Sequence, residues 1–147
     1  MRFRSVPARA HVRPRRPLRA RRSGKRGAAV SDLSTDEHLE GARSFLEVAR
    51  LLADHDRPGD AVSRSYYGVL HATRAVLLTR DLHPQTHKGV HRLLGKVARD
   101  TLDTSFAANL WEWREAYDYE LNVDIPYSVQ EVIRQSETFV HRAEDLC

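Results

Sequence analysis

The amino-acid sequence predicts an all-α protein: an antiparallel bundle of four or five helices that follows a disordered basic tail. Three observations support this fold class. Apolar residues recur at three- and four-residue steps through residues 34–147, no segment shows sustained two-residue alternation, and short segments containing Asp, Gly or Pro separate the apolar stretches. A chain of 147 residues has room for a single hydrophobic core.

The first predicted helix begins at Ser34, which stands three residues before Glu37 in the spacing of a capping box. Residues 56–59, Asp-Arg-Pro-Gly, are expected to end this helix. Its expected apolar stripe comprises Leu39, Ala42, Phe45, Leu46, Val48, Ala49, Leu52 and Ala53.

The second predicted helix, from about Asp60 to Arg80, is expected to be buried on two faces. The first face carries Val62, Tyr66, Val69, Leu70, Val76 and Leu77. The opposite face carries Arg64, Tyr67, His71, Arg74 and Leu78 in place of the Glu and Lys mixture of a solvated surface. We therefore expect another subunit or a ligand to cover this second face.

Three further helices are predicted, at about residues 87–99, at about 105–119 and from 128 onward. The fourth helix brings Arg114 and Asp118 to one flank, because residues four apart are neighbours on a helix. Trp111 falls outside the apolar stripe of the same helix, which again indicates a second buried surface. Ser128 and Glu131 form a second capping box.

Charge divides the chain into a tail, residues 1–33, and a bundle, residues 34–147. Residues 1–30 hold 11 Lys and Arg and no acidic residue, which leaves 13 basic against 20 acidic residues and a net charge of −7 for the rest. An acidic bundle is a poor general binder of nucleic acid. The tail is interpreted as a disordered arm that touches nucleic acid, or as a segment outside the natural protein, with Val30 as the true start. We favour the second interpretation.

Several classes of protein are excluded by what the sequence lacks. No run approaches the roughly 18 apolar residues of a membrane-spanning helix, and no apolar run follows the arginines of the tail, as a signal peptide requires. The single cysteine, Cys147, excludes a disulfide scaffold and fits a cytoplasmic setting. His87 and His91 have metal-ligand spacing but lack a third ligand, so we expect neither a metal nor a cofactor.

Arg114 is the principal candidate for chemistry, because the planar guanidinium can clamp a phosphate with two parallel hydrogen bonds. On spacing alone, a plain ion pair with Asp118 is the favoured interpretation. His71, on the second helix, has the side chain of an acid/base near neutral pH, although many such histidines only hydrogen-bond within an interface.

Three segments, taken in order, resemble a known family. Residues 61–72, AVSRSYYGVLHA, resemble the RAYYAMFHAA element of small prokaryotic HEPN-domain proteins. Residues 86–90, THKGV, resemble the element that opens their next helix, and residues 114–119, REAYDY, resemble their RxxxDY element. The resemblance extends over about residues 36–146.

This resemblance implies an antiparallel bundle that forms a homodimer around the arginine-bearing helix. Many members are RNases that use Arg-x(4–6)-His at the dimer interface, and they are often toxins paired with a minimal nucleotidyltransferase that transfers AMP to a tyrosine. Carried over, Arg114 would contact phosphate and Tyr119 would be the candidate modification site. The sequence departs from the RNase pattern, because no histidine follows Arg114 until His141 and Asp118 stands near the place of the catalytic histidine.

The leading hypothesis is a homodimeric partner of a minimal nucleotidyltransferase in a toxin–antitoxin or defence-like module, with weak or no catalysis of its own. One alternative is an RNA endonuclease toxin, with Arg114, Asp118 and His71 as candidate catalytic residues. Another is a non-catalytic bundle that binds a nucleotide or a protein. The candidate contacts to RNA or nucleotide are Arg64, Tyr67, Arg74 and Arg114.

Overall fold

The computed structural model describes residues 32–120 and 123–147 of the chain. This part of the chain is built from α-helices and contains no strand, so the predicted all-α fold class is confirmed. The helices are α1 (Thr35–Asp54), α2 (Pro58–Leu78), α3 (His87–Val97), α4 (Thr104–Tyr119) and α5 (Val129–Leu146). The tail predicted for residues 1–33, with the alternative start at Val30, lies almost wholly outside the described residues.

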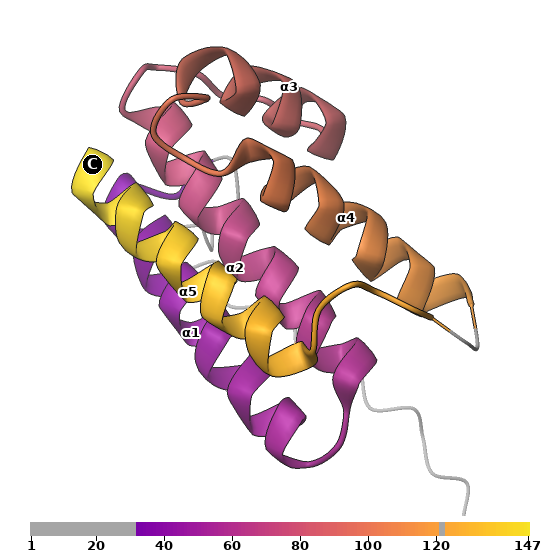
Figure 1. The fold of residues 1–147 in the computed structure, drawn as a ribbon. Coiled ribbons are helices and arrows are strands. Elements are labelled where there is room, and N and C mark those ends of the chain that lie inside the picture. The colour runs from indigo at the N-terminus through magenta and orange to yellow at the C-terminus, as the bar shows by residue number, and fades with distance from the viewer. Residues whose placement is uncertain (1–31, 121–122) are drawn as a thin grey trace, which may run out of the picture.

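Helix α2 is the centre of the bundle. It contacts each of the other four helices, whereas α4 packs only on α2 and α3 among the described elements. Figure 1 shows α1, α2 and α5 running side by side, with α4 along another side of α2 and α3 across the end of the bundle. This central position explains why the sequence of α2 has apolar and aromatic groups on two faces.

Helix ends follow local sequence chemistry. The Ser34 and Ser128 hydroxyls both cap helices, accepting hydrogen bonds from the backbone N–H groups of Glu37 and Glu131. Only the box at Ser34 is complete, because the Glu131 carboxylate bonds to Arg134 and Gln135 rather than to the Ser128 N–H. The turn between α1 and α2 contains Asp56 in the left-handed region, with φ 56°. Pro58 opens α2 at a position where a missing N–H costs nothing, so Pro58 and Gly59 belong to this helix rather than to the predicted loop.

The core lies around the first face of α2, and all six residues predicted there are buried. Tyr66, Leu77, Leu94 and Leu110 are among the largest side chains that are fully buried. The prediction for Val48 was wrong, because its side chain is 39% exposed on the outer side of α1.

Close packing of α1 on α2 depends on Gly68. A Cβ atom at this position would lie 3.1 Å from the Leu46 side chain and 3.2 Å from the carbonyl oxygen of Ala42. The absence of a side chain therefore lets the two helix backbones approach closely.

The second face of α2 is half-buried within this one chain. Phe45 of α1 packs against both Tyr67 and His71, and Arg114 of α4 lies over Tyr67.

None of the described helices combines the length and the apolar character that crossing a membrane demands.

Candidate functional site

Arg114 of α4 lies against the two adjacent tyrosines of α2. Its Nη1 atom donates a hydrogen bond to the Tyr67 hydroxyl at 3.3 Å. Its guanidinium carbon is 5.2 Å from the centre of the Tyr66 ring and 5.7 Å from that of the Tyr67 ring. These distances are within the range of cation–π attraction, so the two rings fix the position of the arginine.

The predicted pairing of Arg114 with Asp118 is present, with 3.5 Å between Nη1 of the arginine and Oδ2 of the aspartate. The arginine side chain is 18% exposed and the aspartate 46%, so the pair lies at the edge of the bundle. The buried Nε atom of Arg114 has no hydrogen-bond acceptor within the described residues. The described contacts of its terminal nitrogens use Nη1, so Nη2 retains donor capacity for a ligand.

Two histidines of α3 share the hydroxyl of Tyr66. Nδ1 of His87 lies 2.5 Å from this hydroxyl, and Nε2 of His91 lies 3.3 Å from it. Burial raises the pKa of the Tyr66 hydroxyl well above its ordinary value, so this group stays protonated. The sequence predictions did not connect either histidine with Arg114.

Both α3 histidines are held in the neutral form at pH 7. Burial lowers the pKa of His91 to about 4, with a further contribution from His87. Burial also lowers the pKa of His87, followed by the positive charges of Arg114 and Arg74. His87 is thus a neutral imidazole, and the nearby charge of Arg114 helps to lower its pKa.

Trp111, which lies outside the apolar stripe of α4, packs against α3 within the chain. Its ring stacks on His91 with ring centres 5.0 Å apart, and on His87 at 6.1 Å. Because these contacts arise where α3 meets α4, the apolar stripe of α4 alone gave no signal for them.

His71 belongs to a separate cluster near the start of α1. Its Nδ1 atom is 2.9 Å from Nδ1 of His38, and its ring stacks on Phe45 at 5.3 Å. Burial lowers the pKa of His71, and burial followed by the charge of His71 lowers that of His38 to about 4. The described contacts of His71 thus do not join it to Arg114 and Asp118.

The remaining predicted contact residues occupy three places. The Arg64 guanidinium lies over the rings of Phe45 and Tyr67, at 5.7 and 5.6 Å. Arg74 lines a pocket between α1, α2 and the segment before α3. Tyr119, the last residue of α4, is 88% exposed.

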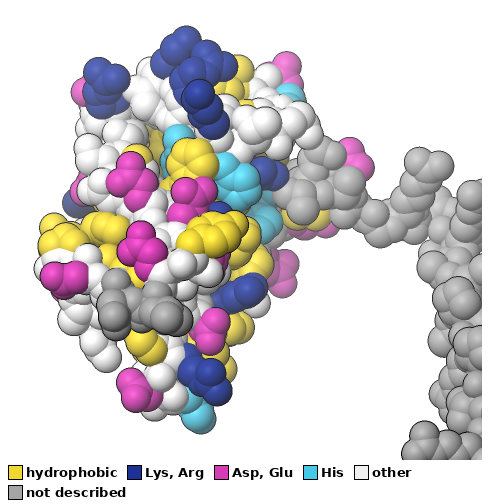
Figure 2. Space-filling view, turned by 90° about the vertical axis from the view of Figure 1, so that its right-hand side faces the viewer, with side chains coloured by type: hydrophobic (Ala, Val, Ile, Leu, Met, Phe, Trp, Pro, Cys, Tyr) yellow, Lys and Arg dark blue, Asp and Glu magenta, His cyan; other side chains and the backbone are white. Residues whose placement is uncertain are grey.

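The structure thus brings together Arg114, Asp118 and Tyr67, and it adds Tyr66, His87, His91 and Trp111 to this group. We call these seven residues the Arg114 cluster. Figure 2 shows histidine, hydrophobic and acidic side chains gathered on one face of the molecule. In the part of the chain that the structure describes, no three His, Cys, Asp or Glu side chains converge as a metal site requires.

The protein is an all-α bundle centred on α2, and Arg114 of the peripheral helix α4 lies against two tyrosines of α2. A family model described as the HEPN domain matches residues 35–147. The chain therefore belongs to the HEPN domain family, and the resemblance drawn from the three sequence elements is confirmed.

Three relatives illustrate the similarity. Two proteins of Methanocaldococcus jannaschii carry the names "Putative toxin MJ0605" and "Putative toxin MJ0142". The first is 28% identical over 109 residues, covering 71% of this chain and 81% of the relative; the second is 29% identical over 107 residues, covering 71% and 70%. A UPF0332 protein of Thermotoga maritima is 31% identical over 113 residues, covering 71% of this chain and 84% of the relative.

Proposed function

We propose that this chain acts as a homodimeric component of a toxin–antitoxin or defence-type module, paired with a minimal nucleotidyltransferase and with weak or no catalysis of its own. Membership of the HEPN domain family supports the proposal, as do the two Methanocaldococcus relatives whose names contain the word toxin. The weak catalysis follows from the absence of a histidine after Arg114 on α4.

The observation that carries the proposal is the position of Tyr119 at the exposed end of α4. With 88% of its surface accessible, its hydroxyl is open to an active site on another protein. In adenylyl transfer the tyrosine oxygen attacks the α-phosphorus of ATP, a new P–O bond forms, pyrophosphate leaves, and a base of the transferase takes the hydroxyl proton. The chain supplies the acceptor, and the nucleotidyltransferase supplies the machinery.

Asp118 is a second reason to expect weak catalysis. Its carboxylate lies 3.5 Å from the Arg114 guanidinium, where it neutralises the positive charge and repels a phosphate that approaches the arginine. An uncompensated arginine would be the better phosphate clamp.

Partnership is tested by examining the adjacent genes for a minimal nucleotidyltransferase, co-expressing any such protein with the tagged full chain, and measuring co-purification. The exposed acidic groups on this end of α4 include Glu115, so Glu115→Arg should weaken the complex. Glu47→Arg, at an exposed position of α1, is the matched control and should leave the complex intact. Equal binding of both variants would argue against this surface, and failure of the native chain to bind would overturn the proposal.

A second candidate function, cleavage of RNA at the dimer interface, is favoured by His87. This imidazole lies on Tyr66 beside Arg114 and is neutral at pH 7, so it can take the proton of a 2′-hydroxyl that attacks the adjacent phosphate. The 5′-oxygen of the next nucleotide then leaves with a proton from an acid, and a 2′,3′-cyclic phosphate forms.

Incubation of the purified chain with single-stranded RNA separates the two candidates. An RNase centred on these residues should lose its activity in both Arg114→Ala and His87→Gln, while His141→Gln, which alters an exposed histidine of α5, should keep it. The leading proposal predicts little or no cleavage by the native chain.

A further inference from the structure

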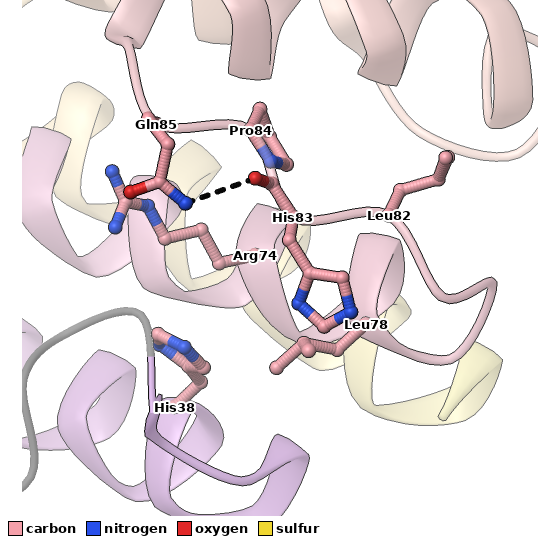
Figure 3. A pocket seen from close by; sticks show the side chains of 7 residues that line it. All are labelled: His38, Arg74, Leu78, Leu82, His83, Pro84 and Gln85. Atoms are coloured by element: carbon pink, nitrogen blue, oxygen red, sulfur yellow. Dashed lines mark hydrogen bonds between the residues drawn. The ribbon is translucent and has the colours of Figure 1, made fainter.

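A pocket distinct from the Arg114 cluster opens between the start of α1, the last turns of α2 and the segment that leads to α3. Its walls are His38, Arg74, Leu78, Leu82, His83, Pro84 and Gln85. Figure 3 shows the side chains of His38, Arg74 and Gln85 around one common space. The pocket therefore combines donor groups with an apolar wall, and no carboxylate lines it.

Arg74 is the charged group of this pocket and lacks a protein partner. Its buried Nε atom has no hydrogen-bond acceptor, and none of the ion pairs found in residues 32–120 and 123–147 includes Arg74. The terminal nitrogens of its guanidinium make none of the hydrogen bonds or ion pairs found in the described residues. They can therefore donate to an anion in the pocket that Arg74 lines.

The positive charge of Arg74 lowers the pKa of nearby histidines. It contributes to lowering the pKa of three histidines, His38, His71 and His87, in each case after burial as the largest cause. The nearby carboxylates are already engaged, since Glu37 bonds to Ser34 and Asp81 bonds to His83 at 3.0 Å. An anion in the pocket would supply the missing negative charge.

Two histidines can assist the arginine. His38 uses Nδ1 for its contact with His71, so its Nε2 atom remains available. An anion would select the tautomer in which His71 donates to Nδ1 of His38 while Nε2 of His38 carries the proton. The exposed ring of His83, held by Asp81, lies at the rim.

The pocket is small, with a volume of about 30 Å³. Pockets that enclose drug-sized ligands are roughly ten times larger or more. The occupant is therefore a group of few heavy atoms, and any larger remainder of the ligand must lie outside. Tetrahedral phosphate suits both the size and the paired donors of a guanidinium.

We propose that the pocket formed by His38, Arg74 and His83 binds a phosphate group, carried either as free phosphate or as the terminal monoester of a small molecule. Its lining side chains come from α1, α2 and the loop before α3. A bound phosphate would thus link the loop before α3 to helices α1 and α2. The proposal rests on this pocket and does not depend on the role of Tyr119 or on the identity of a protein partner.

Calorimetric titration of the full chain with inorganic phosphate tests the proposal. The native chain should bind in a saturable manner, and Arg74→Gln should weaken binding by about tenfold or more, because a charged hydrogen-bond donor is lost. Arg92→Gln is the matched control, since this exposed arginine of α3 does not line the pocket. All variants carry the same basic tail, so phosphate bound by the tail does not change the difference in affinity between the native chain and a variant.

Two further measurements identify the source of the phosphate and provide a second variant in case Arg74→Gln does not fold. Tighter binding of AMP than of inorganic phosphate, with no binding of adenosine, would assign the pocket to a phosphomonoester; equal affinities would assign it to free phosphate. His83→Ala alters an exposed side chain and should also weaken binding, which keeps the test valid if Arg74→Gln does not fold. Unchanged affinity in folded Arg74→Gln, or absence of saturable binding to the native chain, would overturn the proposal.

Discussion

The hydroxyl of Tyr66 lies 2.5 Å from Nδ1 of His87, and this contact joins the centre of α2 to the first residue of α3. Tyr66 is fully buried, so its hydroxyl requires a partner within the protein. The same ring carries the Arg114 guanidinium on its face. Tyr66 therefore connects the packing of three helices with the geometry of the candidate site.

Removal of the Tyr66 hydroxyl should destabilise the bundle. Tyr66→Phe leaves a half-buried imidazole without its close partner, and we expect the free energy of unfolding to fall by about 1 kcal/mol. Tyr67→Phe is the control, because its hydroxyl receives only a 3.3 Å bond from an arginine at the edge of the bundle, and it should have a smaller effect. Chemical denaturation measures both values, and equal effects would contradict the assigned role of Tyr66.

Gly68 and Gly95 should respond in opposite directions to the same substitution. Gly68→Ala places a Cβ atom 3.1 Å from Leu46 and should cost about 1–3 kcal/mol through overpacking. Gly95→Ala meets no atom within 4 Å and should gain about 0.5–1 kcal/mol from helix propensity. Thermal and chemical unfolding of the two variants check this pair; a stable Gly68→Ala would show that α1 and α2 are farther apart.

Much of the fold could be predicted from sequence because each of its signals is local. The cap at Ser34 and the inward face of α2 depend on residues within one helix, and both were predicted correctly. Val48 was assigned to the core because it extends an apolar stripe, yet only a narrower stripe of α1 faces α2 and α5.

The site was harder to predict because its residues meet across helices. Arg114 and Asp118 pair within one turn of α4, and spacing alone indicated that contact. The approach of His87, His91 and Trp111 depends on how α3 crosses α4, which no single helical stripe encodes. The polar side chain of His38 gave no hint that it is 2% exposed and paired with His71.

Acidification should destabilise the protein below neutral pH. In the unfolded chain a histidine has a pKa near 6.5, whereas burial holds the pKa values of His38 and His91 at about 4 in the fold. Between these values the unfolded chain binds more protons, so the stability that these neutral histidines contribute is complete above pH 6.5 and is lost as the pH falls towards 4.

Unfolding measured between pH 7 and pH 4.5 checks this linkage. His91→Gln should make the dependence of unfolding free energy on pH shallower, because one group with a depressed pKa is removed. His141→Gln, a histidine whose side chain is 78% exposed, should leave the slope unchanged. An unchanged slope in His91→Gln would show that this histidine is not held neutral by the fold.

The most direct test of the proposed function is the intact mass of the chain after incubation with ATP and the minimal nucleotidyltransferase that co-purifies with it. The account predicts addition of adenylyl groups to the native chain and to Tyr127→Phe, which alters another exposed tyrosine, but not to Tyr119→Phe. Peptide mapping should locate the modification on Tyr119. Modification that persists in Tyr119→Phe, or a native chain whose mass does not change, would contradict the account.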